Sequence, residues 1–378
     1  MDISNSVWSS PRDYLKFHAP VNPVMFFSPS ALHERALRFL NGFPGLVTYA
    51  VKSNPDMTVL QSLVSFGVNA FDVASPVEIQ LLRDIAPDAA LHYHNPVRAR
   101  HEIEFAKKMG VKSYSVDSAS EFAKLRDILD ADGTEISVRF TLPVSGASYN
   151  FGGKFGATPE KAAELLRAVA EAGFIPSITF HPGTQCTDAE AWGTYIRAAA
   201  GIAGMAGVKI HRLNVGGGFP SRRLPGELDL EAIFGVIRNA AVQAFGDDQP
   251  VLVCEPGRAM VSDAFSLAVR VNAIRDGADL FMNDGIYGGL SEQHLIGLTR
   301  RMQAFRADGT PLGGPTVGRR LFGPTCDSTD MMPGLIEVPL ALDEGDYLVF
   351  HSLGAYSTAT ATRFNGFGDI QLATVGTL

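Results

Sequence analysis

Cysteine is scarce in this sequence: Cys186, Cys254 and Cys326 lie far apart along 378 residues. No two of them form a CxxC pair, so the spacing of a zinc knuckle is absent and nothing indicates a disulfide framework. An odd number of widely spaced cysteines is typical of proteins from a reducing compartment. The sequence therefore predicts a cytoplasmic protein.

Long apolar runs and an excess of positive charge are missing too. No stretch of about 18 apolar residues occurs, and residues 1–20 lack a basic segment followed by an apolar one, so neither a transmembrane helix nor a signal peptide is expected. Acidic side chains outnumber basic ones by 40 to 32, and the net charge of -8 argues against a nucleic-acid partner. It leaves room for a cationic small-molecule partner.

What is present is a regular alternation of two patterns. Short β-branched or aromatic runs occupy Leu46–Lys52, Val68–Val73, Ala90–His94, Val111–Asp117, Glu135–Thr141, Ile175–His181, Lys209–Val215 and Val251–Glu255. Segments with apolar residues at helical spacing occupy Met57–Phe66, Pro76–Ile85, Arg98–Met109, Ser118–Leu129, Pro159–Ala172, Asp188–Ala206 and Leu228–Phe245. Eight strands alternating with helices are typical of a (β/α)8 barrel, whose usual length of about 250 residues matches residues 27–262.

The pattern changes after Asp263. Strand-like runs broken by Gly, Pro and Asp occupy Phe265–Ile274, Asp279–Met282, Arg319–Phe322 and Tyr347–His351, with a short helical pattern near Gln293–Met302. We therefore expect an α/β barrel followed by an all-β domain, a β-sandwich or β-barrel formed by residues 1–26 and 263–378.

Polar residues interrupt the barrel strands mainly at their C-terminal ends. They are Lys52, Asp72, Asp117, Arg139, His181, Gly216–Gly218 and Glu255. Any one of them could be an ordinary rim side chain. Because (β/α)8 barrels carry their active sites at this end, seven together predict a constructed pocket.

The residue types narrow the chemistry. Lys52 is either a rim lysine or a desolvated amine that can form a Schiff base. Gly216–Gly218 follows a strand and could cradle a phosphate, although it matches neither GxxxxGK[ST] nor GxGxxG. Glu255 and Arg258 add a carboxylate and a guanidinium suited to phosphate. A lysine, a phosphate cradle and a carboxylate on one rim indicate pyridoxal 5'-phosphate (PLP), and His181 could stack on its ring. No metal site is predicted, since no second His or Cys lies at ligand spacing from His181.

The ordered motifs YAVKSN, FDVAS, HPGTQC, GGGFP, EPGR, GPTCDSTD and GAYS span nearly the whole chain. Together they resemble the fold-type III PLP-dependent basic amino-acid decarboxylases, and ornithine decarboxylase in particular. The resemblance implies an alanine-racemase-like barrel with a β-domain. It also implies a head-to-tail homodimer with shared active sites, to which the β-domain contributes.

The resemblance also implies roles for individual residues. Lys52 would bind the PLP aldehyde, Glu255 the pyridine nitrogen, and His181 the ring face. Phosphate contacts would come from Gly216, Gly217, Gly218, Gly257, Arg258, Tyr356 and Thr184. Asp72, Glu78 and Arg139 would form a polar network near Lys52. The reaction would pass through an external aldimine and a quinonoid intermediate.

The motif Gly323–Asp327 has its own chemistry. Cys326 alone could be a small buried hydrophobic residue, and Asp327 alone could cap a turn. In the resemblance, Cys326 comes from the partner subunit and protonates Cα, while Asp327 binds the distal ammonium of the substrate. Tyr356 alone could be core packing; only the motif makes it a phosphate ligand.

The sequence favours ornithine and/or lysine as the substrate. Diaminopimelate decarboxylases typically carry Glu after the motif cysteine, where this chain has Asp327. The Tyr-Asp pair usual in ornithine enzymes is absent after Asp284–Gly288, and Glu292 could replace it as a ligand of the distal amine. Diaminopimelate, arginine, a carboxylated polyamine or a specialised amino acid stays open as an alternative, as does a non-catalytic regulatory homologue. A racemase is disfavoured because such enzymes use a Tyr where this chain has the Cys326 motif. Residues 145–156, rich in Gly and Ser, could form a mobile flap or a plain connection.

Overall fold

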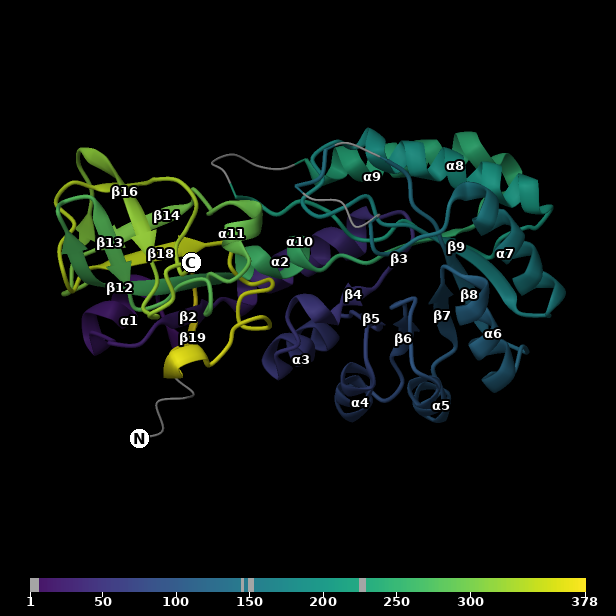
Figure 1. Cartoon of the computed structure of the whole chain (residues 1–378), viewed down its shortest axis with the longest axis horizontal. Coiled ribbons are helices and arrows are strands. Elements are labelled where there is room, and N and C mark those ends of the chain that lie inside the picture. Colours follow the sequence, from purple (N-terminus) through teal and green to yellow (C-terminus); the bar gives the residue numbers. More distant parts are fainter. Residues whose placement is uncertain (1–6, 144–145, 149–152, 224–228) are drawn as a thin grey trace. The chain divides into compact units, whose positions relative to one another are not determined.

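The computed structural model describes residues 7–143, 146–148, 153–223 and 229–378. The chain divides into two compact units, whose helices and strands are labelled in Figure 1. One unit contains residues 36–220 and continues to Gly257 after an insertion that begins at Ser221. The other contains the N-terminal part up to Arg35 and the C-terminal part from Arg258. The sequence-based boundaries were 27–262 for the barrel and 1–26 plus 263–378 for the β-domain.

The first unit is a nearly closed barrel of parallel strands, as the sequence predicted. Within the described residues its strands are β3 (Leu46–Val47), β4 (Tyr49–Ala50), β5 (Ala70–Val73), β6 (Ala90–Tyr93), β7 (Ser113–Val116), β8 (Glu135–Arg139), β9 (Ile175–Thr179), β10 (Arg212–Asn214) and β11 (Val251–Cys254). Their order is β3-β11-β10-β9-β8-β7-β6-β5-β4. The two edge strands, β3 and β4, are consecutive in the chain and flank Thr48, whose backbone N–H bonds the carbonyl oxygen of Cys254 at 2.9 Å. This single interrupted strand brings the two edges of the sheet together.

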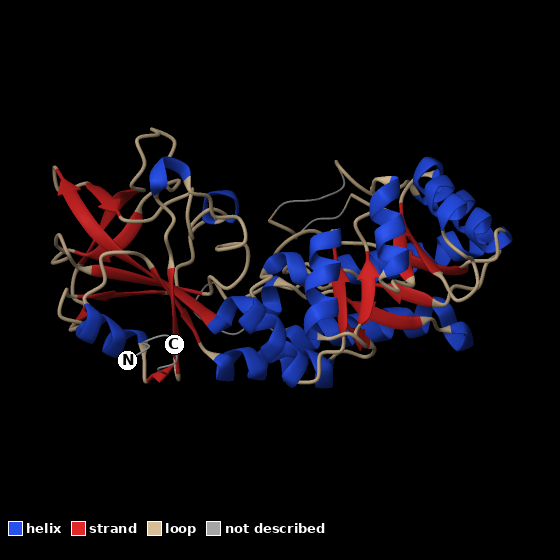
Figure 2. Cartoon of the chain, turned by 90° about the horizontal axis from the view of Figure 1, so that it is seen from below, coloured by secondary structure: helices blue, strands red, loops and turns tan. Residues whose placement is uncertain are grey.

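Helices follow the strands and lie outside them, as Figure 2 shows in blue around red. They are α2 (Pro29–Gly42), α3 (Met57–Ser65), α4 (Pro76–Ile85), α5 (Arg100–Lys108), α6 (Ala119–Ile128), α7 (Pro159–Glu171), α8 (Glu190–Ala206) and α9 (Leu230–Phe245). The seven predicted helices are confirmed, with ends shifted by at most two residues. Serine or threonine side chains cap several of them: Ser75 accepts from the backbone N–H of Glu78, and Thr158 from that of Lys161.

The second unit is built mainly from strands. They are β1 (Val7–Trp8), β2 (Val24–Phe27), β12 (Phe265–Arg275), β13 (Asp279–Met282), β14 (Met302–Phe305), β15 (Pro311–Leu312), β16 (Thr316–Phe322), β17 (Ile336–Pro339), β18 (Tyr347–His351) and β19 (Gln371–Val375). The long strand β12 is the centre, because it pairs with β2, β13 and β18. A buried cluster that includes Phe26, Tyr347 and Val349 forms the core. The predicted all-β character is confirmed.

The helical prediction for Gln293–Met302 was too long. Helix α11 covers only Gln293–Ile296, because Gly297 follows with a φ of 83° and ends it. Met302 begins β14, which pairs with β18. The sequence analysis also missed helix α1 (Pro11–His18), although Ser10 caps it and proline begins it. No helix in the described ranges is long and apolar enough to cross a bilayer.

Barrel stability is expected to depend on Leu213. It lies fully buried on β10 between Ile178 of β9 and Leu252 of β11. We expect Leu213→Ala to lower the free energy of unfolding by about 2–5 kcal/mol, through lost burial and a residual cavity. The matched control, Leu37→Ala on α2, removes the same atoms from a side chain that is 38% exposed and should cost at most about 1 kcal/mol. Equal shifts in urea denaturation would contradict this account of the core.

Candidate active site

The C-terminal ends of the parallel barrel strands carry the predicted polar residues. Lys52 lies in a 3-10 turn, Val51–Ser53, directly after β4. Asp72 belongs to β5, Arg139 ends β8, His181 follows β9 by two residues, and Glu255 directly follows β11. Because the strands are parallel and adjacent in one sheet, their C-terminal ends share one rim, as the sequence analysis expected.

Lys52 and Asp72 form an ion pair on this rim. The Lys52 Nζ lies 3.4 Å from Asp72 Oδ2, and about half of the lysine side chain is exposed while Asp72 is buried. Burial, together with the charge of Glu255, raises the pKa of Asp72 to about 7, although Lys52 and His94 oppose the shift. Among the described residues, no group bonds the other buried oxygen of Asp72, Oδ1.

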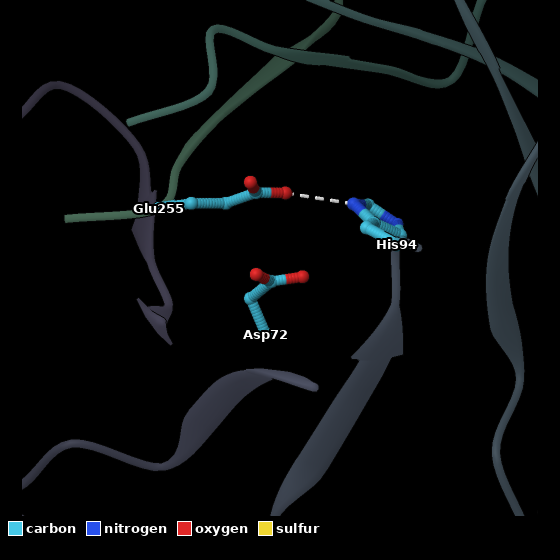
Figure 3. Close-up of side chains that lie close together, drawn as sticks. All are labelled: Asp72, His94 and Glu255. Carbon is cyan, nitrogen blue, oxygen red and sulfur yellow. Dashed lines mark hydrogen bonds and ion pairs between the residues drawn. The ribbon is translucent and has the colours of Figure 1, made fainter. Parts of the chain in front are cut away.

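Glu255 is held by two side chains that the sequence analysis missed. Its Oε1 accepts from His94 Nδ1 at 2.7 Å and from Asn214 Nδ2 at 2.5 Å. Figure 3 shows Asp72, His94 and Glu255 converging, with the dashed line joining the histidine to the glutamate. Burial alone would raise the pKa of Glu255, but the hydrogen bond and charge of His94 outweigh it, so that the pKa lies well below its usual range. The carboxylate is therefore ionised.

The signal for His94 was present in the sequence. His94 ends the run Ala90–His94, so it occupies the same strand-end position as Asp72 and Arg139. Asn214 likewise ends β10, two residues before Gly216. Neither His94 nor Asn214 belongs to one of the motifs named above, so neither was predicted as a site residue.

Asp72, His94 and Glu255 also present ligand atoms within 4.8 Å of one another, which is close enough to suit a metal ion. The geometry has a simpler explanation. Glu255 and His94 are already joined by a hydrogen bond, and the Lys52 ammonium adds a positive charge beside Asp72. We therefore treat the three residues as a hydrogen-bonded acid–base cluster.

His181 is half-buried and uncharged. Its Nδ1 accepts a hydrogen bond from the backbone N–H of Gly183 at 3.0 Å. Burial, with the positive charges of Arg139 and Lys52, lowers the pKa of His181 to about 3. The ring is therefore a neutral flat surface at physiological pH, which suits packing against an aromatic group.

The turn after β10 requires its glycines. Gly216 and Gly218 have φ values of 69° and 82°, in the left-handed region that favours glycine. A Cβ on Gly216 would lie 2.2 Å from the carbonyl oxygen of Phe180, and a Cβ on Gly217 would lie 2.6 Å from that of Glu255. Side chains are thus excluded from this turn by close backbone contacts with both neighbouring strand ends.

Other predicted barrel residues have supporting positions. Glu78 accepts a hydrogen bond from the backbone N–H of Ala74 at 2.6 Å, which ties the N-terminus of α4 to the end of β5. Asp117 accepts from the backbone N–H of Gly156 at 3.0 Å, and Thr184 is buried. Of the suggested flap 145–156, residues 145 and 149–152 lie outside the described residues.

In the second, mainly β unit, called the β-unit from here on, Arg258 and Glu292 form an ion pair. Both are buried, and the two guanidinium Nη atoms each donate to a different oxygen of Glu292. The Arg258 guanidinium also lies 5.0 Å from the ring centre of Tyr356. Glu292 was expected as a ligand of the substrate's distal amine. This pairing satisfies its charge internally and does not favour that hypothesis.

Cys326 is exposed, Asp327 is partly exposed, and neighbouring side chains contact both. Asn365 Oδ1 accepts from the Cys326 backbone N–H at 3.2 Å and from its Sγ at 3.3 Å. The hydroxyl of Tyr287 donates to Asp327 Oδ2, and this bond lowers the pKa of Asp327. Tyr287 in turn packs on Phe364, with ring centres 4.7 Å apart. A thiol and an ionised carboxylate thus lie side by side on this unit.

The barrel set fits PLP on its own geometry. The half-exposed amine of Lys52 would suit the aldehyde of PLP, and the ionised, buried carboxylate of Glu255 would suit its pyridinium nitrogen. The glycine turn offers backbone N–H groups where no side chain can stand. The unpartnered Asp72 Oδ1 leaves a buried acceptor for a group that the protein itself does not supply.

Comparisons with known proteins agree. Residues 30–262 match the family model of the pyridoxal-dependent decarboxylases, pyridoxal binding domain. The chain is 34% identical to the chloroplastic ornithine decarboxylase of Nicotiana glauca, over 86% of this chain and 77% of that protein. It is 31% identical to antizyme inhibitor 2 of Xenopus laevis, over 88% and 76% of the two chains.

A solved structure gives a similar result. The arginine decarboxylase of Paramecium bursaria Chlorella virus, bound to agmatine, superposes with a TM-score of 0.86 at 27% identity, covering 96% of this chain and 98% of that one. The match extends over both units, so the likeness includes the β-unit as well as the barrel. The chain belongs to the fold-type III pyridoxal-dependent decarboxylase family, and it is a PLP-dependent decarboxylase.

Proposed function

We propose that this enzyme removes the α-carboxyl group of a basic L-amino acid, ornithine and/or lysine, to give putrescine or cadaverine. The observation that carries the proposal is that the thiol of Cys326 and the ionised carboxylate of Asp327 are neighbours in the chain on the β-unit. A carboxylate is the natural partner of a distal ammonium group. The similarity to an ornithine decarboxylase supports this substrate class.

The barrel residues would hold the cofactor. Lys52 would bind the PLP aldehyde, Glu255 would face the pyridine nitrogen, and the neutral face of His181 would pack on the ring. The phosphate would be held by Gly216, Gly217, Gly218, Gly257 and Thr184, while Asp72 and Arg139 would set the charge around Lys52. PLP supplies an electron sink for the electrons left behind when CO2 departs. The phosphate roles of Arg258 and Tyr356 stay predictions from the family resemblance.

The protein's own acid–base groups complete the reaction. Cys326 Sγ donates its proton to the substrate Cα after CO2 has left. Asn365 supports this role because its Oδ1 contacts both the backbone N–H and the Sγ of Cys326, which restricts where the thiol can point. Asp327 binds the distal ammonium and orients the substrate, and Tyr287 holds the carboxylate in place.

We further propose a homodimer in which Cys326 and Asp327 act at the site of the partner subunit, and a reducing, cytoplasmic location that keeps the thiol intact. Polyamine biosynthesis is the corresponding physiological role. The second candidate function is regulatory, as suggested by the similarity to an antizyme inhibitor. Lys52 and Cys326 are both present, and their presence favours catalysis over regulation.

Lys52 is expected to be essential for cofactor attachment. Lys52→Ala should abolish the visible absorbance band of lysine-bound PLP and with it CO2 release, because it removes the amine that lies beside Asp72 at the strand ends. The control Lys107→Ala changes an exposed lysine and should leave the band and the rate intact. A band that survived unchanged in the Lys52 variant would reject the proposed attachment site.

Substrate choice can be measured as CO2 release from ornithine, lysine, diaminopimelate and arginine. We expect ornithine or lysine to give the highest kcat/KM, and Asp327→Asn to lower it by about 10- to 100-fold through loss of a charge-assisted contact. The variant should affect a substrate without a distal amine much less. Highest turnover on diaminopimelate or arginine would contradict the proposed specificity, and none on any would favour a regulatory role.

Shared active sites can be tested by mixing subunits. Lys52→Ala and Cys326→Ala homodimers should each be inactive or severely impaired. Random exchange puts half of the protein into mixed dimers with one intact site each, so mixing should restore at most about a quarter of wild-type activity. If Cys326 acts within its own chain, mixing will restore nothing.

A further inference from the structure

His94 has a position that neither the family motifs nor the proposed reaction assigns. It extends from the end of β6, is 8% exposed, and points at the carboxylate proposed to meet the cofactor nitrogen. We propose that His94 is a positioning residue that fixes one oxygen of Glu255 and thereby orients this carboxylate. This inference rests on the proposed role of Glu255 and adds to it the residue that makes the role possible.

The geometry fixes the orientation of the imidazole ring at both nitrogens. Nδ1 lies 2.7 Å from Glu255 Oε1, and Nε2 lies 3.2 Å from the hydroxyl of Ser113 on β7. Ser113 is buried as well, so water does not compete for this bond. The ring therefore cannot rotate away from the glutamate without losing two hydrogen bonds.

Two donors converge on the same oxygen of Glu255. Asn214 Nδ2 reaches Oε1 at 2.5 Å, and the Asn214 Oδ1 accepts from the backbone N–H of Gly216 at 2.9 Å. Among the described residues, no hydrogen bond reaches the second oxygen, Oε2. This arrangement leaves Oε2 available for a pyridinium nitrogen, while Oε1 is committed to the protein.

The charges around His94 favour its protonated form. Burial opposes protonation, but the hydrogen bond and charge of Glu255, with Asp72 and Glu135, raise the pKa of His94. Burial and the charge of His94 lower the pKa of the nearby His92 to about 4, although Glu135 and Glu255 oppose the shift. Within the described residues, His94 is hydrogen-bonded to a carboxylate and His92 is not, which separates the two histidines.

Three substitutions separate positioning from packing. His94→Leu keeps most of the side-chain volume but removes the donor, whereas His94→Asn keeps an N–H donor near the place of Nδ1. We expect the Leu variant to bind PLP about 10- to 100-fold more weakly, by analogy with the losses that follow removal of a residue supporting a metal ligand, and the Asn variant to retain most of the affinity. His101→Asn, a control at an exposed histidine of α5, should bind PLP like the wild type.

The measurements are the PLP dissociation constant, obtained by dialysis of the purified holoenzymes, and the visible spectrum of the bound cofactor. Neither depends on the identity of the amino-acid substrate. Glu255→Gln is measured in parallel. If it leaves PLP binding unchanged, the proposed role of Glu255 fails; if it weakens binding while His94→Leu does not, only the inference about His94 fails.

Two further outcomes would overturn the inference. One is a Leu variant that binds PLP better than the Asn variant, which would mean that His94 only fills space. The other is a divalent metal present at one ion per chain in the purified holoenzyme and lost in His94→Leu, which would make Asp72, His94 and Glu255 a metal site. Wild-type affinity in the Asn variant with a large loss in the Leu variant supports positioning.

Discussion

The rest of the barrel rim depends on one buried charge, the carboxylate of Glu255. A carboxylate out of water is costly unless hydrogen bonds and opposite charge stabilise it. His94 and Asn214 supply the hydrogen bonds, and Lys52 and His94 the positive charge. Burial, together with the charge of the ionised Glu255, raises the pKa of Asp72 to about 7. Burial and the positive charges of Arg139 and Lys52 keep His181 neutral, although the charge of Glu255 opposes this.

The backbone of the rim is as constrained as its charges. The glycine turn after β10 contacts the carbonyl oxygens of two neighbouring strand ends, so its N–H groups occupy places that no side chain can fill. Asn214 joins the two parts of the site, because its amide nitrogen binds Glu255 and its amide oxygen binds Gly216. A shift of β10 would therefore change both the carboxylate and the turn. This explains why a large cofactor can be held by residues spread over several strands.

The β-unit presents its chemistry differently. Cys326 and Asp327 lie in turns and are oriented by Asn365 and Tyr287 rather than by strands. Arg258 and Glu292 are buried together, so Glu292 is less suited to a distal amine than Asp327.

The sequence by itself determined the eight predicted barrel strands, the helices between them and the β-domain, because the alternation of apolar runs is a local pattern. It also determined the motif residues, because polar residues at the ends of strands can be read from the sequence directly. It named Lys52, Asp72, His181 and Glu255 without distances. Only the tertiary structure decided that His94 and Asn214 hold Glu255, although 161 residues separate His94 from Glu255 in the chain. It alone decided that Glu292 pairs with Arg258. The physical reason is that ionisation and pairing depend on burial and on neighbours from other strands, and no local pattern encodes these.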